Sequence, residues 1–249
     1  MEESKTTSLR TGRLFLLAVV TISASAFLWP FLTTLAKKIG IDENVGRLTA
    51  GAIVLALILI LMPKKNMREF GWCRSENTGN WKFIIPILCM CVFNIPYLFL
   101  TTAFNPVYIA LVNAALVAFA EELACRGYLL RALETKLGER RAILLSGMVF
   151  GLFHLINLTH EPAKDVLLQI LYTFVIGIVF AVVRVKTKSL FWPIIAHTAL
   201  NFVYELTTDN NDVLWLDTLF TIFCTALAVA YGVSYEKGKI LEAERKASA

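Results

Sequence analysis

Charged side chains are scarce in this sequence. Only 17% of its 249 residues are Asp, Glu, Lys or Arg, whereas 57% are hydrophobic. A soluble domain has about 25% charged and about 45–50% apolar residues. This composition excludes an ordinary soluble domain. Residues 83–120 contain no charged side chain at all, which points to lipid as the solvent.

Several chemical signatures are also absent. The five cysteines are odd in number, and their spacing fits neither a disulfide framework nor a zinc cluster. No segment reads HExxH, no serine lies in a GxSxG context, and no paired aspartates occur within the apolar runs. These absences disfavour the zincin, serine and aspartyl protease arrangements. We also find no internal repeat and no second domain.

Eight apolar runs are present, each close to the roughly 20 residues that a helix needs to cross about 30 Å of hydrocarbon. They cover roughly residues 14–36, 45–63, 83–103, 107–124, 142–159, 166–183, 189–206 and 213–234. The runs are continuous rather than alternating, so they predict helices and not a β-barrel. Asn105–Pro106 is a turn signal that divides residues 83–120 into a helical hairpin. The remaining prolines within the runs are expected to be tolerated there. We therefore predict an all-α, polytopic membrane helix bundle of about eight transmembrane helices, forming one integral membrane domain over residues 1–249.

The distribution of positive charge orients this bundle. When the runs are threaded across a membrane, 20 of the 24 Lys and Arg residues fall on the side of the two termini. This asymmetry follows the positive-inside rule, so both termini are predicted to be cytoplasmic. The first run continues through Leu35 and Ala36, so we expect a retained span rather than a cleaved signal peptide. The net charge of +5 is explained by topology, and no nucleic-acid partner is expected. Residues 235–249 are predicted to be a polar cytoplasmic tail.

Ionisable residues inside membrane spans are costly and usually functional. Such residues are few here, and some of them form a pattern: Glu121, Glu122 and Arg126 at the end of the fourth run, His154 in the fifth, and His197 in the seventh, with the amide of Asn201 one turn after His197. We interpret the third histidine, His160, as a solvated loop residue.

Helix geometry assigns these residues to faces. His197 and Asn201 are four residues apart and share a face, as do Phe150 and His154. Glu122 and Arg126 have the same spacing, which predicts an ion pair. Glu121 and Glu122 differ by about 100° around a helix, so we expect them not to point at one target. Glu122 would then be structural, while Glu121 faces the interior of the bundle.

One carboxylate, two imidazoles and an amide can hydrolyse a bond with activated water. A glutamate removed from bulk water can accept a proton near neutral pH, and imidazole or amide groups can stabilise an oxyanion. Alternatively, Glu121, His154 and His197 could hold zinc with an open position for water. We expect a water-filled cavity that opens to the cytoplasm.

The motifs "EELACR" (121–126), "FGLFH" (150–154) and "HTALN" (197–201) resemble those of the CAAX prenyl protease and bacteriocin-processing family, also called the Abi family. The resemblance covers a motif-bearing core of about residues 107–206. It implies an intramembrane endopeptidase with Glu121 as the main catalytic carboxylate and His154 helping to activate water. It also implies that His197 and Asn201 stabilise the oxyanion, while Glu122, Arg126 and Phe150 support the site. Both a metal-dependent and a metal-free mechanism have been proposed for the family, so zinc stays open.

The resemblance implies a peptide or protein substrate reached from the lipid bilayer. Roles in peptide or bacteriocin processing and in self-immunity occur in the family. The short, compact chain suggests a bacterial plasma membrane. Two alternatives stay open: a non-proteolytic membrane scaffold of the same fold, and a proton-coupled transporter, which would also place Glu and His inside spans.

Overall fold

The structure is a computed structural model that describes residues 2–65, 67–76, 85–100, 104–159, 161–207, 218–230 and 232. Every named element in this part of the chain is a helix, which confirms the all-α fold class. The elements are α1 (Glu2–Ser23), η1 (Ala24–Leu28), α2 (Trp29–Lys38), α3 (Glu43–Leu61), η2 (Met67–Phe70), α4 (Ile85–Phe93), α5 (Tyr97–Leu100), α6 (Val107–Glu122), η4 (Leu123–Leu129), α7 (Leu130–Leu137), α8 (Glu139–Phe153), η5 (His154–Thr159), α9 (Ala163–Thr187) and α10 (Phe191–Leu206). The predicted tail and His160 lie outside the described residues.

Within the described residues, five helical segments are long and apolar enough to cross a membrane: Thr11–Lys38, Glu43–Leu61, Val107–Leu137, Glu139–Thr159 and Ala163–Thr187. They correspond to five of the eight predicted spans. The other three appear as shorter helices, namely Ile85–Phe99, the 16-residue α10 and Thr218–Ala230. Eight crossings therefore remain a prediction.

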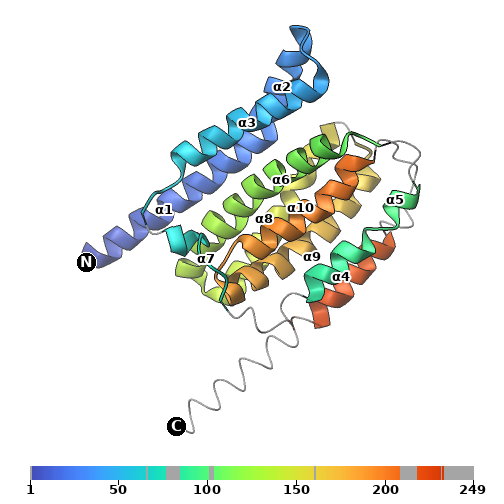
Figure 1. The fold of residues 1–249 in the computed structure, drawn as a ribbon. Coiled ribbons are helices and arrows are strands. Elements are labelled where there is room, and N and C mark those ends of the chain that lie inside the picture. The colour runs from blue at the N-terminus through green and yellow to red at the C-terminus, as the bar shows by residue number, and fades with distance from the viewer. Residues whose placement is uncertain are drawn as a thin grey trace.

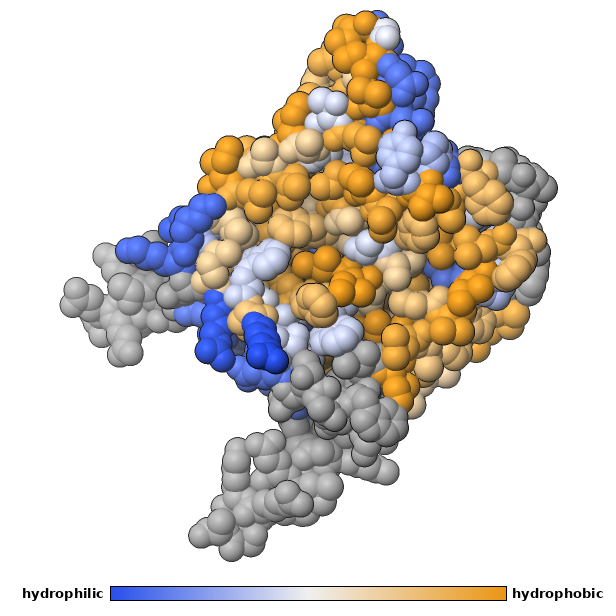
Figure 2. Space-filling model, in the orientation of Figure 1, coloured by the Kyte–Doolittle hydropathy of each residue, from blue (hydrophilic) through white to orange (hydrophobic). Residues whose placement is uncertain are grey.

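The helices form a bundle with a flanking layer. Helices α1, α2 and α3 lie along one side, α6, α8, α9 and α10 form the centre, and α4 and α5 lie on the opposite side (Figure 1). Helix α10 packs on α6, and α9 packs on α8. Hydrophobic residues cover most of the described surface in Figure 2, while hydrophilic residues gather at its margins. Large apolar side chains such as Ile60 (75% exposed) and Phe99 (82%) face outward, as lipid-facing residues do.

Small residues allow α8 and α9 to approach closely. Gly147 and Gly151 are spaced as GxxxG on α8, the pattern that brings membrane helices into backbone contact. A Cβ atom added at Gly177 of α9 would lie 2.9 Å from the Cα of Gly147, and one at Gly151 would lie 2.8 Å from the carbonyl oxygen of Ile170. This contact fixes the height of Phe150 on α8 and of His154, the first residue of η5.

The outer ends of α6 and α10 are tied together. Phe104 and Thr207 form an antiparallel bridge, and the Asn105 side chain donates to the carbonyl oxygen of Glu205 at 2.8 Å. Glu205 also pairs with Arg47 of α3 at 2.6 Å. These contacts hold α6 and α10 antiparallel, so the residues that precede Glu121 on α6 and those that follow His197 on α10 run toward the same end.

The predicted continuous span 83–103 is wrong in one respect: the helix breaks at residues 94–96 between α4 and α5. Pro96 cannot donate a backbone hydrogen bond and its ring clashes with the preceding turn. The Asn94 side chain instead donates to the carbonyl oxygen of Leu200 at 3.1 Å. By contrast, Pro86 and Pro193 lie in the first turns of α4 and α10, where proline costs little.

The helix that carries the glutamates is longer than predicted. Instead of ending near residue 124, it continues through the π-helix η4 and α7 to Leu137, so Glu121 and Glu122 lie within it. The carbonyl oxygen of Cys125 accepts from Leu130 N–H in the wider π-turn and from the Ser146 hydroxyl at 3.0 Å. Gly138, with φ of +77°, then turns the chain into α8.

Candidate active site

A buried ion pair lies at the centre of the bundle. Arg126 Nη1 donates to Glu122 Oε1 at 2.8 Å, and both side chains are completely buried. The predicted pair is thus confirmed, but Glu122 has a second partner. The same oxygen lies 2.9 Å from Nδ1 of His197, which comes from α10. A carboxylate can only accept, so the proton of this bond belongs to Nδ1.

The expectation that the two glutamates point at different targets is wrong. His197 Nε2 lies 3.8 Å from Glu121 Oε2, so the imidazole stands between the two carboxylates. The difference of about 100° between neighbouring helix positions does not prevent this, because each glutamate has a long side chain and the ring presents a nitrogen to each of them.

Phe150 closes the site from α8. Its ring makes edge contacts with the rings of His154 and His197, at centroid distances of 5.4 and 5.6 Å. The guanidinium carbon of Arg126 lies 4.1 Å from the centre of the same ring. Phe150 therefore contributes a cation–π contact to the buried arginine and also spaces the two histidines.

His154 is oriented by the backbone of its own helix. Its Nδ1 lies 3.0 Å from the carbonyl oxygen of Phe150, which must accept the proton. In the neutral ring this leaves Nε2 as an acceptor. The helix changes from α to 3-10 at this residue. The tighter turn begins at His154, and the half-buried side chain of this residue lines a cavity.

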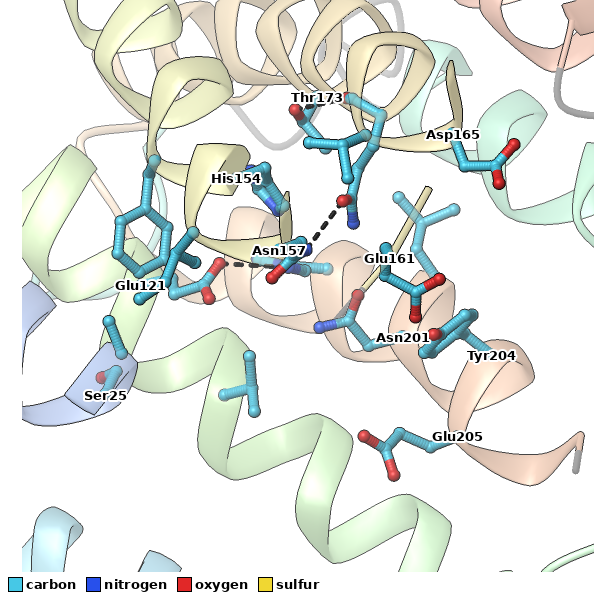
Figure 3. Close-up of a pocket in the computed structure, with 18 of the residues that line it drawn as sticks. Ser25, Glu121, His154, Asn157, Glu161, Asp165, Thr173, Asn201, Tyr204 and Glu205 are labelled. Atoms are coloured by element: carbon cyan, nitrogen blue, oxygen red, sulfur yellow. Dashed lines mark hydrogen bonds and ion pairs between the residues drawn. The ribbon is translucent and has the colours of Figure 1, made fainter. Parts of the chain in front are cut away.

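That cavity has a volume of about 1200 Å³ and is lined by all four predicted catalytic residues: Glu121, His154, His197 and Asn201. Figure 3 shows the Glu121 carboxylate, the His154 ring and the Asn201 amide around this space. Asn201 is half-buried, one turn beyond His197. Glu122 and Arg126 do not line the cavity and lie behind it.

The cavity extends toward the end of the bundle that holds Glu161, Asp165 and Glu205. No described residue of the basic connections 64–76, 130–141 or 184–190 lines it. We expected an opening to the cytoplasm, yet positive charge places the connection between α8 and α9 outside. Under the charge-based topology, the end of the cavity that these residues line would face away from the cytoplasm. The direction of the cavity is set by the space left beside α6 and α10, and the distribution of charge along the chain does not determine it.

Sequence reasoning missed two amides of the cavity wall. Asn157 donates to Oε1 of Gln169 at 2.7 Å, which joins η5 to α9. Asn113 is 1% exposed and lines the cavity from α6. Its position two turns before Glu121 was a readable signal, because residues eight apart share a helix face.

The residues as placed do not form a metal site. Among the described residues, no three His, Cys, Asp or Glu side chains converge closely enough to hold a metal ion. The Nδ1 atoms of His154 and His197 are hydrogen-bonded, to a carbonyl oxygen and to Glu122, so only Nε2 of each ring could bind a metal ion.

Residues 103–203 match the family model described as Rce1-like, type II CAAX prenyl endopeptidase Rce1-like. The match includes all three motifs and confirms the resemblance drawn from them. A search of the curated proteins found no match. Over this segment the chain is therefore similar to a CAAX-type endopeptidase. Together with the long apolar helices, the match indicates an integral membrane protein.

Proposed function

We propose that this protein hydrolyses a peptide bond inside the membrane, in the cavity between α6, α8, α9 and α10, with water activated by Glu121. The proposal rests on the different surroundings of two neighbouring carboxylates. Glu121 lines the cavity, whereas neighbouring Glu122 lies behind it with its Oε1 held by two partners.

Glu121 is the better proton acceptor of the two. Glu122 Oε1 already accepts from both Arg126 and His197, which ties this carboxylate to the scaffold. Glu121 is 9% exposed, and its Oε2 lies 3.8 Å from His197 Nε2, which is longer than a hydrogen bond. A water molecule in the cavity can therefore donate to Glu121. His154, whose Nε2 is an acceptor when the ring is neutral, can hold the second proton of that water.

His197 and Asn201 serve the developing oxyanion. Glu121, Glu122 and Arg126 carry two negative charges and one positive charge, so a protonated His197 would bring the cluster to formal neutrality. Its Nε2–H would then donate toward the cavity. The Asn201 amide, one turn farther along α10, supplies a second donor.

The reaction balances with these groups alone. Water oxygen attacks the carbonyl carbon as Glu121 takes one proton, and the carbonyl oxygen becomes an oxyanion between His197 and Asn201. The C–N bond then breaks as the protonated Glu121 gives its proton to the leaving amine. One water is consumed, and an acid and an amine are released.

The decisive experiment is incubation of the purified full-length protein in detergent with a quenched peptide library, with and without a chelator. We expect cleavage by the wild type, the same rate with chelator, and no bound zinc by elemental analysis. Absence of cleavage of any library peptide would overturn the proposal. Loss of cleavage with the chelator, restored by zinc, would replace the metal-free mechanism.

A further inference from the structure

We infer that Asn113 forms a binding subsite for the peptide backbone of the substrate, about three to four residues from the scissile bond. The inference rests on the proposed peptidase function. It concerns a residue outside all three motifs.

Asn113 is a buried amide without a partner. Its side chain is 1% exposed, and within the described part of the chain neither Oδ1 nor Nδ2 has a hydrogen-bond partner. An unsatisfied buried amide is destabilising, and an apolar residue of the same shape would remove that cost. A carboxamide at this position therefore needs a reason other than the stability of the fold.

The other amides of the same wall show what a structural role looks like. Asn94 donates to the carbonyl oxygen of Leu200, and Asn157 donates to Gln169. Both are used within the protein, whereas Asn113 lines the same cavity with a donor and an acceptor that have no partner among the described residues. One donor beside one acceptor is complementary to one residue of an extended peptide, whose N–H and C=O point to the same side.

The position of Asn113 relative to Glu121 determines which residue of the substrate would lie at Asn113. Asn113, Val117 and Glu121 are four residues apart, and all three line the cavity. Eight helical residues at about 1.5 Å each place Asn113 about 12 Å from Glu121 along α6. An extended peptide advances about 3.3 Å per residue, so this distance corresponds to three or four substrate residues.

The rest of the cavity lies in the direction that runs from Glu121 toward Asn113. Because α6 and α10 are antiparallel, Asn113 and Asn201 both lie on the same side of the Glu121–His197 contact. The cavity continues past them to Glu161 and Glu205. A substrate that reaches Glu121 from that end must pass Asn113.

The test uses a peptide that the wild-type protein cleaves, and a set of its analogues in which one backbone amide at a time is replaced by an ester. Asn113→Leu should raise KM by roughly fivefold to hundredfold, the value of two neutral hydrogen bonds, with kcat little changed. In the wild type, the ester should weaken binding most at a position three or four residues from the cleaved bond. In Asn113→Leu the same ester should have no further effect, because this variant already lacks the hydrogen bond that the ester removes.

A matched control separates binding from folding. Asn113→Leu should keep or raise the melting temperature, since it removes an unpaired buried amide. Asn94→Leu is the same substitution in the same cavity, but it should lower the melting temperature because its amide is already bonded to Leu200.

Two results would overturn the inference while leaving the proposed function intact. One is cleavage by Asn113→Leu with the wild-type KM, and the other is an identical response of both proteins to every ester. If the wild type cleaves no peptide, the proposed function and this inference both fall.

Discussion

His197 Nδ1 lies 2.9 Å from Glu122 Oε1, although 75 residues separate the two in the chain. The same oxygen accepts from Arg126 at 2.8 Å. The contact joins α10 to α6 at the point where both helices reach the cavity. The orientation of a candidate catalytic histidine is therefore coupled to the buried ion pair that stabilises the bundle.

Glu121→Gln should abolish most proteolysis without unfolding the protein. The substitution keeps the shape of the side chain but removes the proton acceptor, and loss of a general base typically costs about 10²- to 10⁴-fold in rate. The measurement is kcat/KM on a cleaved peptide, together with thermal unfolding in detergent. Cleavage at the wild-type rate would eliminate Glu121 as the base.

Glu122→Gln is the adjacent control and should behave differently. It leaves the buried charge of Arg126 without a counter-charge and weakens the hold on His197. We therefore expect a lower melting temperature together with reduced activity. A Glu122→Gln protein of full stability would show that the ion pair contributes little to the fold.

Arg126→Ala should destabilise the protein by about 3–5 kcal/mol, because it leaves Glu122 as an uncompensated buried charge. Arg126→Lys should restore stability only in part, since an ammonium does not reproduce the planar contact of the guanidinium with Phe150. Arg131→Ala is the matched control. Arg131 pairs with Glu134 at 3.4 Å near the surface, and such pairs are worth about 0–1 kcal/mol. Equal melting temperatures for Arg126→Ala and Arg131→Ala would contradict the structure.

Gly177→Ala should separate α8 from α9. The added methyl would lie 2.9 Å from Gly147 Cα and 3.1 Å from Arg126 Nη2, and the backbone atom cannot move aside cheaply. Overpacking of this kind costs about 1–3 kcal/mol, so both stability and activity should fall. Gly12→Ala on α1 has nothing within 4 Å and should be neutral or stabilising, because alanine is the better helix former. Unchanged stability in Gly177→Ala would mean that the two helices are not in backbone contact.

Reporter fusions at the C-terminus and near Pro162 should report opposite sides of the membrane, with the C-terminus in the cytoplasm. The excess of Lys and Arg on the side of the termini is the reason. Because Pro162 lines the cavity, the same assay determines the side from which the cavity is reached. Cytoplasmic reporting from the Pro162 fusion would refute the charge-based topology and favour a cytoplasmic opening.

The sequence by itself determined the fold class and the local partners. Long uncharged runs predicted membrane helices because backbone groups in lipid must be satisfied within the segment. The spacing of Glu122 and Arg126 predicted their ion pair, since residues four apart share a helix face. The three motifs were enough to identify a family resemblance that the match over residues 103–203 confirms.

Only the tertiary structure decided how these local features meet. The contact of His197 with both glutamates depends on the packing of α10 against α6, which no spacing within one helix encodes. The unpaired amide of Asn113 is visible only once every neighbouring helix is in place, because burial and hydrogen bonding are properties of the whole bundle. The direction of the cavity also depends on the tertiary structure. Charge along the chain orients a membrane protein, but the gaps left between packed side chains decide where its cavity runs.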